Sequence, residues 1–277
     1  MASVADNAEN VTAGEESIFA PLKHGVFRRI WLASLASNFG WLIQSVGAAW
    51  AMTELSGSPD MVALVQTAAF MPSMLMSLAS GAIADMYDRR IIGIIALSIN
   101  VTAAAALTVL TFLGILTPSL LLIFCFIIGA GGALFGPSWQ ASVSEQVPKD
   151  LLPQAISLNS ISFNIARSFG PAIGGALVAA AGAVAAFLVN TLFYLPMITV
   201  LFLWKRKQET PRLPPESLGR AMISGVRYVM HSPAIRTVIF RTFLLGMIGG
   251  AVSALMPLVA RDLVGGGPLT FGVLLGS

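Results

Sequence analysis

The residue best suited to a chemical role is Arg167, a cation in the middle of the apolar run 152–180. A cation so deep in a bilayer costs at least ~2.5 kcal/mol, so it should face a polar interior rather than lipid. Ser160, Asn164 and Arg167 fall on one side of a helix, because successive residues turn by about 100°. We interpret this side as the wall of an aqueous cavity that holds a small molecule. The alternative is that Arg167 clamps carbonyl groups of a neighbouring helix.

Two further apolar runs carry an amide side chain. Gln44 lies in the run 30–53 and Gln66 in the run 61–84. Together with Asn164 and Arg167 they form the predicted substrate cavity. For both glutamines, hydrogen bonding between helices explains their presence equally well.

Groups suited to metal or acid–base chemistry are scarce. The two histidines, His24 and His231, lie outside the apolar runs, and no run carries a carboxylate at mid-depth. The single cysteine, Cys125, excludes a disulfide within the chain. We therefore predict no catalytic residue, no metal site and no cofactor, and an enzyme embedded in a membrane becomes a weak alternative.

The composition predicts the elements that position these residues. Only 10% of the 277 residues are charged and 56% are hydrophobic, whereas soluble proteins carry about 25% charged residues. A net charge of +3 also gives no basis for nucleic-acid binding. An apolar stretch of roughly 20 residues crosses a bilayer as a helix. We predict an all-α polytopic membrane protein with seven such runs: 30–53, 61–84, 91–113, 118–141, 152–180, 184–204 and 236–260.

Lysine and arginine are concentrated on one side of this arrangement. When alternate loops are compared, all but three of the 16 Lys and Arg residues lie on the side of the N-terminus. Arg261 lies on the opposite side, and Arg167 and Arg241 lie inside apolar runs. By the positive-inside rule, the N-terminus is predicted to be cytoplasmic.

These patterns divide the chain into four parts. A polar start, a six-span bundle, a charged connector and the beginning of a second bundle are expected in that order. We expect the connector to contain a surface amphipathic helix over 217–231. Since the last apolar run stops at Ser277 before it could cross a membrane, we expect a longer natural protein. The four parts are a disordered cytoplasmic tail (1–26), the bundle (27–204), the cytoplasmic connector (205–235) and a seventh span with the onset of an eighth (236–277).

A motif of small and charged residues follows the second apolar run. The stretch 81–90 reads GAIADMYDRR and contains Gly81, Asp85, Arg89 and Arg90. It resembles the loop signature of the major facilitator superfamily between spans two and three, with Met86 and Asp88 in place of the usual Arg and Gly. The resemblance implies a gate in which Asp85 meets a helix N-terminus of the second bundle. Alternatively, Asp85 and Arg89 form a solvated pair and Arg90 only anchors the topology.

A second motif lies in the fifth run, where Gly170, Pro171, Gly174 and Gly175 resemble the Gly-Pro-x-x-Gly-Gly motif of superfamily exporters. The upstream glycines of that motif are replaced by Ala166 and Ser157. Proline can kink a helix and glycine permits close packing. We predict a kink here; ordinary small-residue packing is the alternative.

Short stretches elsewhere narrow the resemblance. The segments 54–59, 64–67, 136–141 and 158–160 are similar to the bacterial branch that contains the enterobactin exporter and the transmembrane secretion effectors. This resemblance implies a monomeric, twelve-span secondary transporter in the bacterial inner (plasma) membrane. It would export small amphipathic molecules, such as drugs or siderophores, by alternating access. Its partners would be the lipid bilayer, a small-molecule substrate and protons. The alternatives are a major facilitator importer of a small metabolite and a non-transporting membrane scaffold.

The topology can be tested with reporters fused at Thr117 and Gln208. We expect the reporter at Thr117 to lie outside the cytoplasm and the reporter at Gln208 to lie inside, because the positive charges flank the second position. Paired periplasmic and cytoplasmic reporter activities measure this. The reverse activity at either site would contradict the topology.

Overall fold

The structure is a computed structural model that describes residues 17–56, 58–205 and 218–276. The first part of the predicted tail and residues 206–217 of the connector therefore lie outside the described residues. Within the described part the chain is helical and contains no strand. The prediction of an all-α protein is confirmed.

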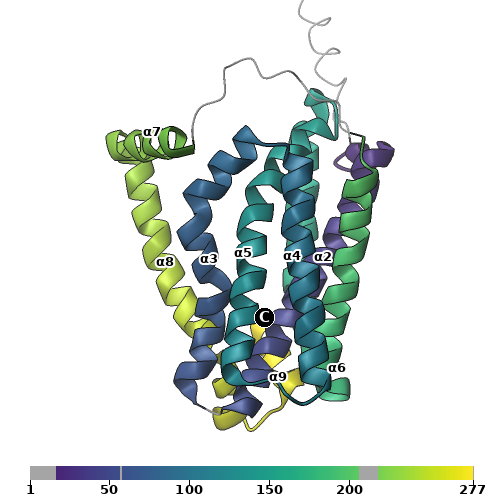
Figure 1. Cartoon of the computed structure of the whole chain (residues 1–277), viewed down its shortest axis with the longest axis vertical. Helices are drawn as coiled ribbons and strands as arrows, with labels where there is room; N and C mark the ends of the chain where they lie inside the picture. The colour runs from purple at the N-terminus through teal and green to yellow at the C-terminus, as the bar shows by residue number, and fades with distance from the viewer. Residues whose placement is uncertain (1–16, 57, 206–217, 277) are drawn as a thin grey trace, which may run out of the picture.

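Eight long helices and four short helical turns make up the described chain (Figure 1). Proline opens several of them, where its missing N–H would be unbonded in any case. The long helices are α2 (Gly25–Leu55), α3 (Pro59–Met86), α4 (Arg89–Phe112), α5 (Pro118–Ser142), α6 (Leu152–Leu203), α7 (Leu218–His231), α8 (Pro233–Leu258) and α9 (Pro268–Gly276). The short turns are η1 (Ala20–Lys23), η2 (Val143–Glu145), η3 (Lys149–Leu151) and η4 (Val259–Leu263), the last a π-helical turn.

Four helical segments of the described residues are long and apolar enough to cross a membrane: 89–112, 118–145, 149–203 and 233–263. The third has 55 residues, more than twice the roughly 20 that one crossing needs. It reverses at Gly182, whose φ of 72° lies in the left-handed region that favours glycine. This one segment therefore contains two antiparallel helices. α2 and α3 have 31 and 28 residues. They are not among the four membrane-crossing candidates, but they pack beside them.

The helices pack through small residues. α2 lies along α6, with Gly40 against Asn190 and Gly47 against Ala186. α5 contacts both α3 and α4, where Gly131 lies against Asn100. Lipid tails are as apolar as the helix surfaces, so close backbone approach must supply the association energy. α7 lies crosswise at the end of α8 (Figure 1), and whether it rests on a membrane surface stays a prediction.

The glycines of the predicted kink motif form close contacts on two sides of α6. Gly170 lies against Leu42, Gly174 against Ile43, and Gly175 against the start of α9. The non-helical residue inside α6 is Gly182, whereas Pro171 keeps helical geometry. The reversal at Gly182 falls between the predicted runs 152–180 and 184–204, where a left-handed glycine can turn the chain. The kink at Pro171 stays a prediction, since a proline can tilt a helix whose residues keep helical geometry.

The contact of α6 with α9 can be tested at Gly175. An added Cβ would clash with the Pro268 carbonyl oxygen, so Gly175→Ala should destabilise the protein by about 1–3 kcal/mol. Thermal unfolding in detergent measures this effect. Gly249→Ala is the matched control, since nothing lies within 4 Å of its added Cβ. Equal melting temperatures for the two variants would contradict the packing argument.

Candidate functional site

A cavity of about 770 Å³ lies among α2, α3, α4, α5 and α6. Its walls come from the first half of α2, the second half of α5 and the first turns of α6, so it lies toward the α7 end of the bundle (Figure 1). The opposite end is occupied by α9, which packs on α6. Such a pocket is large enough for a small organic molecule.

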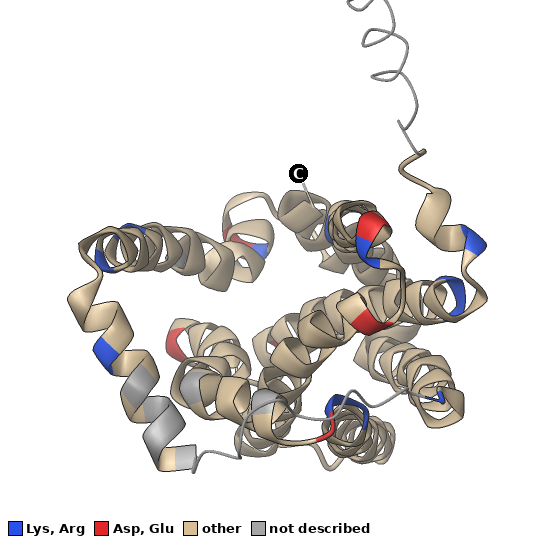
Figure 2. Cartoon of the chain, turned by 90° about the horizontal axis from the view of Figure 1, so that it is seen from above, with Lys and Arg blue, Asp and Glu red and all other residues tan. Residues whose placement is uncertain are grey.

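The cavity wall is polar but uncharged. None of its described lining residues is Asp, Glu, Lys, Arg or His, and few charges lie along the helices in the view from above (Figure 2). Its polar groups are hydroxyls and amides, and its apolar surface is largely aromatic. These residues include Ser34, Ser37, Asn38, Ser73, Asn100, Gln140, Asn159, Ser160, Asn164 and Tyr194, with Trp41, Phe70, Phe135, Trp139 and Phe163.

Two aromatic pairs stiffen this wall. Trp41 of α2 meets Phe70 of α3 edge to face, with ring centroids 6.1 Å apart and planes at 83°. Phe135 and Trp139, one turn apart on α5, stack at 5.8 Å with planes at 16°. Both geometries are favourable for aromatic rings. The cavity therefore combines aromatic surface with hydrogen-bonding groups, as a site for an amphipathic ligand requires.

The structure places one of the four predicted cavity residues, Asn164, in the wall. Gln44 is buried and accepts a hydrogen bond from the Asn190 side chain, so it joins α2 to α6. Gln66 is partly buried outside the lining. Arg167 is exposed and lies nearly one turn beyond Asn164, past the end of the cavity. Gln44, Gln66 and Arg167 thus lie outside the described wall of this cavity. Their contact with a substrate stays a prediction.

Several wall residues were not predicted. Asn38 and Asn100 are amides inside apolar runs, the same signal that drew attention to Gln44. Asn100 is only 3% exposed, and its side chain, like that of Asn190, lies beside Tyr194. Next to this group, Asn190 donates to Gln44 and so joins α6 to α2. The wall on α4 and α6 therefore contains an amide and a phenol side by side.

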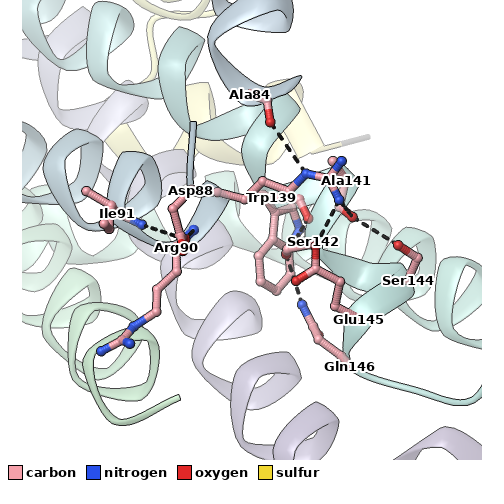
Figure 3. Close-up of polar contacts among 11 residues, drawn as sticks. Ala84, Asp88, Arg90, Ile91, Trp139, Ala141, Ser142, Ser144, Glu145 and Gln146 are labelled. Carbon is pink, nitrogen blue, oxygen red and sulfur yellow. Dashed lines mark hydrogen bonds and ion pairs between the residues drawn. The ribbon is translucent and has the colours of Figure 1, made fainter. Parts of the chain in front are cut away.

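Arg89 of the loop motif joins three helix ends. Its Nη1 lies 2.9 Å from Glu145 Oε1 and donates to the Ala141 carbonyl at 2.9 Å, while its Nε donates to the Ala84 carbonyl at 3.4 Å (Figure 3). The start of α4 is thereby tied to the ends of α3 and α5. Arg89 therefore pairs with Glu145. The predicted alternative of a pair with Asp85 stays a prediction, because the Asp85 side chain lies outside the described part.

Arg90 binds the carboxyl end of α6. Its Nε donates to the Leu201 carbonyl at 2.7 Å and its Nη2 to the Phe202 carbonyl at 2.5 Å. A cation is favourable there, because the last carbonyls of a helix carry partial negative charge. Asp88 caps the start of α4 by accepting from the N–H groups of Arg90 and Ile91. Arg90 thus binds the end of α6, in addition to the predicted role of anchoring the membrane topology.

The other two residues of the loop motif have no described contact of this kind. Gly81 has nothing within 4 Å of an added Cβ among the described residues. Asp85 belongs to the last turn of α3, but its side chain lies outside the described part. Its predicted role in a gate stays a prediction.

At the other end of the bundle, Arg261 joins α2 to η4. Its Nη1 donates to the Thr53 carbonyl at 3.3 Å, near the carboxyl end of α2. Its Nε lies 2.6 Å from Asp262 Oδ1. Both ends of the bundle therefore use arginine to hold helix carbonyls.

Within the described chain, no group of three or more His, Cys, Asp or Glu residues could bind a metal.

Comparison with known proteins places this geometry in a family. The chain is 28% identical over 239 residues to the Staphyloferrin A transporter of Staphylococcus aureus, covering 85% of this chain and 59% of that protein. It is 25% identical over 235 residues to the multidrug efflux pump Tap of Mycobacterium tuberculosis, covering 82% and 54%. The chain thus spans little more than half the length of these relatives.

Solved structures show the same fold. A bacterial homologue of the human lysosomal transporter Spinster, in an inward-facing and unoccupied conformation, matches with a TM-score of 0.64 at 15% identity, covering 95% of this chain and 60% of that one. A peptide-transporter-type POT family structure matches with a TM-score of 0.55 at 16% identity, covering 91% and 51%. The predicted major facilitator fold is confirmed.

A sequence model of one family, the transmembrane secretion effectors, matches residues 16–277. Its members and the relatives above are transporters, which confirms the prediction that the protein is not an enzyme. Together with the uncharged cavity inside a helical bundle, this match identifies the chain as a member of the transmembrane secretion effector family of major facilitator transporters.

Proposed function

We propose that this protein exports small amphipathic molecules across the bacterial plasma membrane by alternating access. The observation that carries the proposal is the cavity of about 770 Å³, whose wall joins aromatic rings to amides and hydroxyls. A ligand with both apolar and polar parts matches such a wall better than a simple ion. The efflux pump among the relatives supports the outward direction.

The position of the cavity is compatible with loading of a substrate from the cytoplasm. It lies in the half of the bundle near α7, while α6 and α9 are packed together at the other end. If the positive-inside rule sets the orientation, the α7 end faces the cytoplasm and the N-terminus lies there too. The structure then corresponds to the state that loads substrate from the cytoplasm. Closure at this end and separation at the other would release it outside.

Proton coupling remains part of the proposal through the family resemblance. The described cavity wall contains no carboxylate or histidine, so a proton-binding group would lie outside it. The cytoplasmic end would be organised by Arg89 and Arg90, which join the ends of α3, α5 and α6 to the start of α4. We propose that this joined end moves as one body when the bundles rock, with Asp85 contacting the second bundle.

Transport by the full-length protein tests the proposal. Everted vesicles with an imposed pH gradient should accumulate at least one member of a panel of amphipathic dyes and siderophores. Asn164→Ala should lower uptake about two- to tenfold, the effect of one lost hydrogen bond. Thr199→Ala, outside the cavity wall and bonded only to its own helix, should leave it unchanged. Accumulation only in right-side-out vesicles would indicate import and contradict export.

The role of Arg90 can be tested by stability. Arg90→Gln removes a cation from the end of α6 and should destabilise the protein by up to ~2 kcal/mol. Arg90→Lys should recover part of this loss, because the charge remains while the second donor is lost. Thermal unfolding in detergent provides the measurement. The control is Arg241→Gln, an exposed arginine on α8; an equal melting temperature for both glutamine variants would refute the anchoring role.

A further inference from the structure

The tryptophans of the bundle differ in how their indole N–H groups are used. Trp31 donates to the Leu158 carbonyl at 2.9 Å, and Trp50 donates to Glu54 Oε1 at 2.7 Å. Trp41 and Trp139 line the cavity, and their indole N–H groups donate to no acceptor within the described chain. An indole N–H in a partly apolar site normally finds a partner. These two donors are therefore available to a bound molecule.

The same two tryptophans also supply aromatic surface from different helices. Trp41 lies on α2 and is partly buried beside Phe70; Trp139 lies on α5 and is partly buried beside Phe135. Because each ring already touches one aromatic neighbour, its orientation is restricted before a ligand arrives. A preoriented ring loses less conformational entropy on binding.

The remaining wall groups define the polarity of the ligand. Asn159 contributes a buried Oδ1 atom that accepts no hydrogen bond from the described residues, so a ligand donor can satisfy it. Since the described wall carries no cation, a carboxylate or phosphate would lose its hydration without gaining a counter-charge, which is strongly unfavourable. A cation could still be attracted by the faces of the aromatic rings.

We propose that Trp41 and Trp139 determine substrate specificity, selecting a planar aromatic molecule that is neutral or singly cationic and carries hydrogen-bond acceptors. The wall discriminates against polycarboxylates. This inference rests on the proposed transport function, whose cavity it uses, but it concerns recognition rather than movement. Binding and transport can therefore be measured separately.

Three probes test this recognition by the purified full-length protein. Acridone is a neutral planar ring system with one carbonyl acceptor and one N–H donor, berberine is a planar aromatic cation with ether oxygens as acceptors, and citrate is a tricarboxylate. Acridone and berberine should bind, as measured by fluorescence titration, whereas calorimetry should detect no binding of citrate. Binding of citrate without binding of either aromatic probe would overturn the proposed ligand class.

Variants of the two tryptophans assign the roles. Trp41→Phe and Trp139→Phe keep an aromatic ring but lose the N–H, so each should weaken acridone binding about two- to tenfold. The alanine variants should weaken it further, because stacking is lost as well. Trp204→Phe is the matched control: Trp204 is buried at the end of α6 outside the lining, and its variant should bind like the parent. Melting temperatures verify that each variant is folded.

The outcomes separate recognition from transport. Unchanged acridone affinity in all four variants at Trp41 and Trp139 would overturn their role, even if vesicles transport a substrate. Tryptophan-dependent binding without transport of any probe would support this inference while contradicting the proposed function. Vesicles that transport citrate but neither aromatic probe would leave the transporter assignment intact and refute the ligand class.

Discussion

Close packing of α2 against α6 is the constraint on which the rest of the structure depends. Gly40 and Gly47 of α2 lie against α6, and Gly170 and Gly174 of α6 lie against α2. Within lipid, no hydrophobic force pulls helices together, so backbone proximity must provide dispersion contacts. The same approach buries the hydrogen bond that joins α2 to Asn190 on α6. Any larger side chain on this contact would separate the two helices that form one side of the cavity.

Arginines at the two ends of the bundle stabilise helix termini. Arg89 and Arg90 hold carbonyls of α3, α5 and α6 at one end, and Arg261 holds a carbonyl of α2 at the other. Each places a cation where a helix carries partial negative charge. These contacts link helices without placing an ion in the interior. The cavity between the two ends can therefore stay uncharged while its surroundings are firmly connected.

An uncharged cavity wall is compatible with the proposed alternating-access cycle. No described wall residue has a charge that must be paired in one state and hydrated in the next, so the described wall would impose little electrostatic barrier on that proposed movement. Aromatic rings and amides can hold ligands of varied shape through many weak contacts. The hydrogen bond between Asn190 and Gln44 meanwhile joins α6 to α2 near the site.

The resemblance of the motifs at 81–90 and 170–175 predicted the superfamily. Hydropathy and the order of charges are properties of local sequence, and they were sufficient to predict an all-α membrane protein. They could not show which polar residues share a cavity, because the rotation and depth of each helix depend on its neighbours. Arg167 follows Asn164 on the same face yet lies beyond the cavity, and Gln44 bonds to a helix far along the chain. Trp41 and Trp139 carried no distinguishing sequence signal. Only tertiary packing decided that α2 and α5 bring both rings to one wall, since that wall exists only when the helices are assembled.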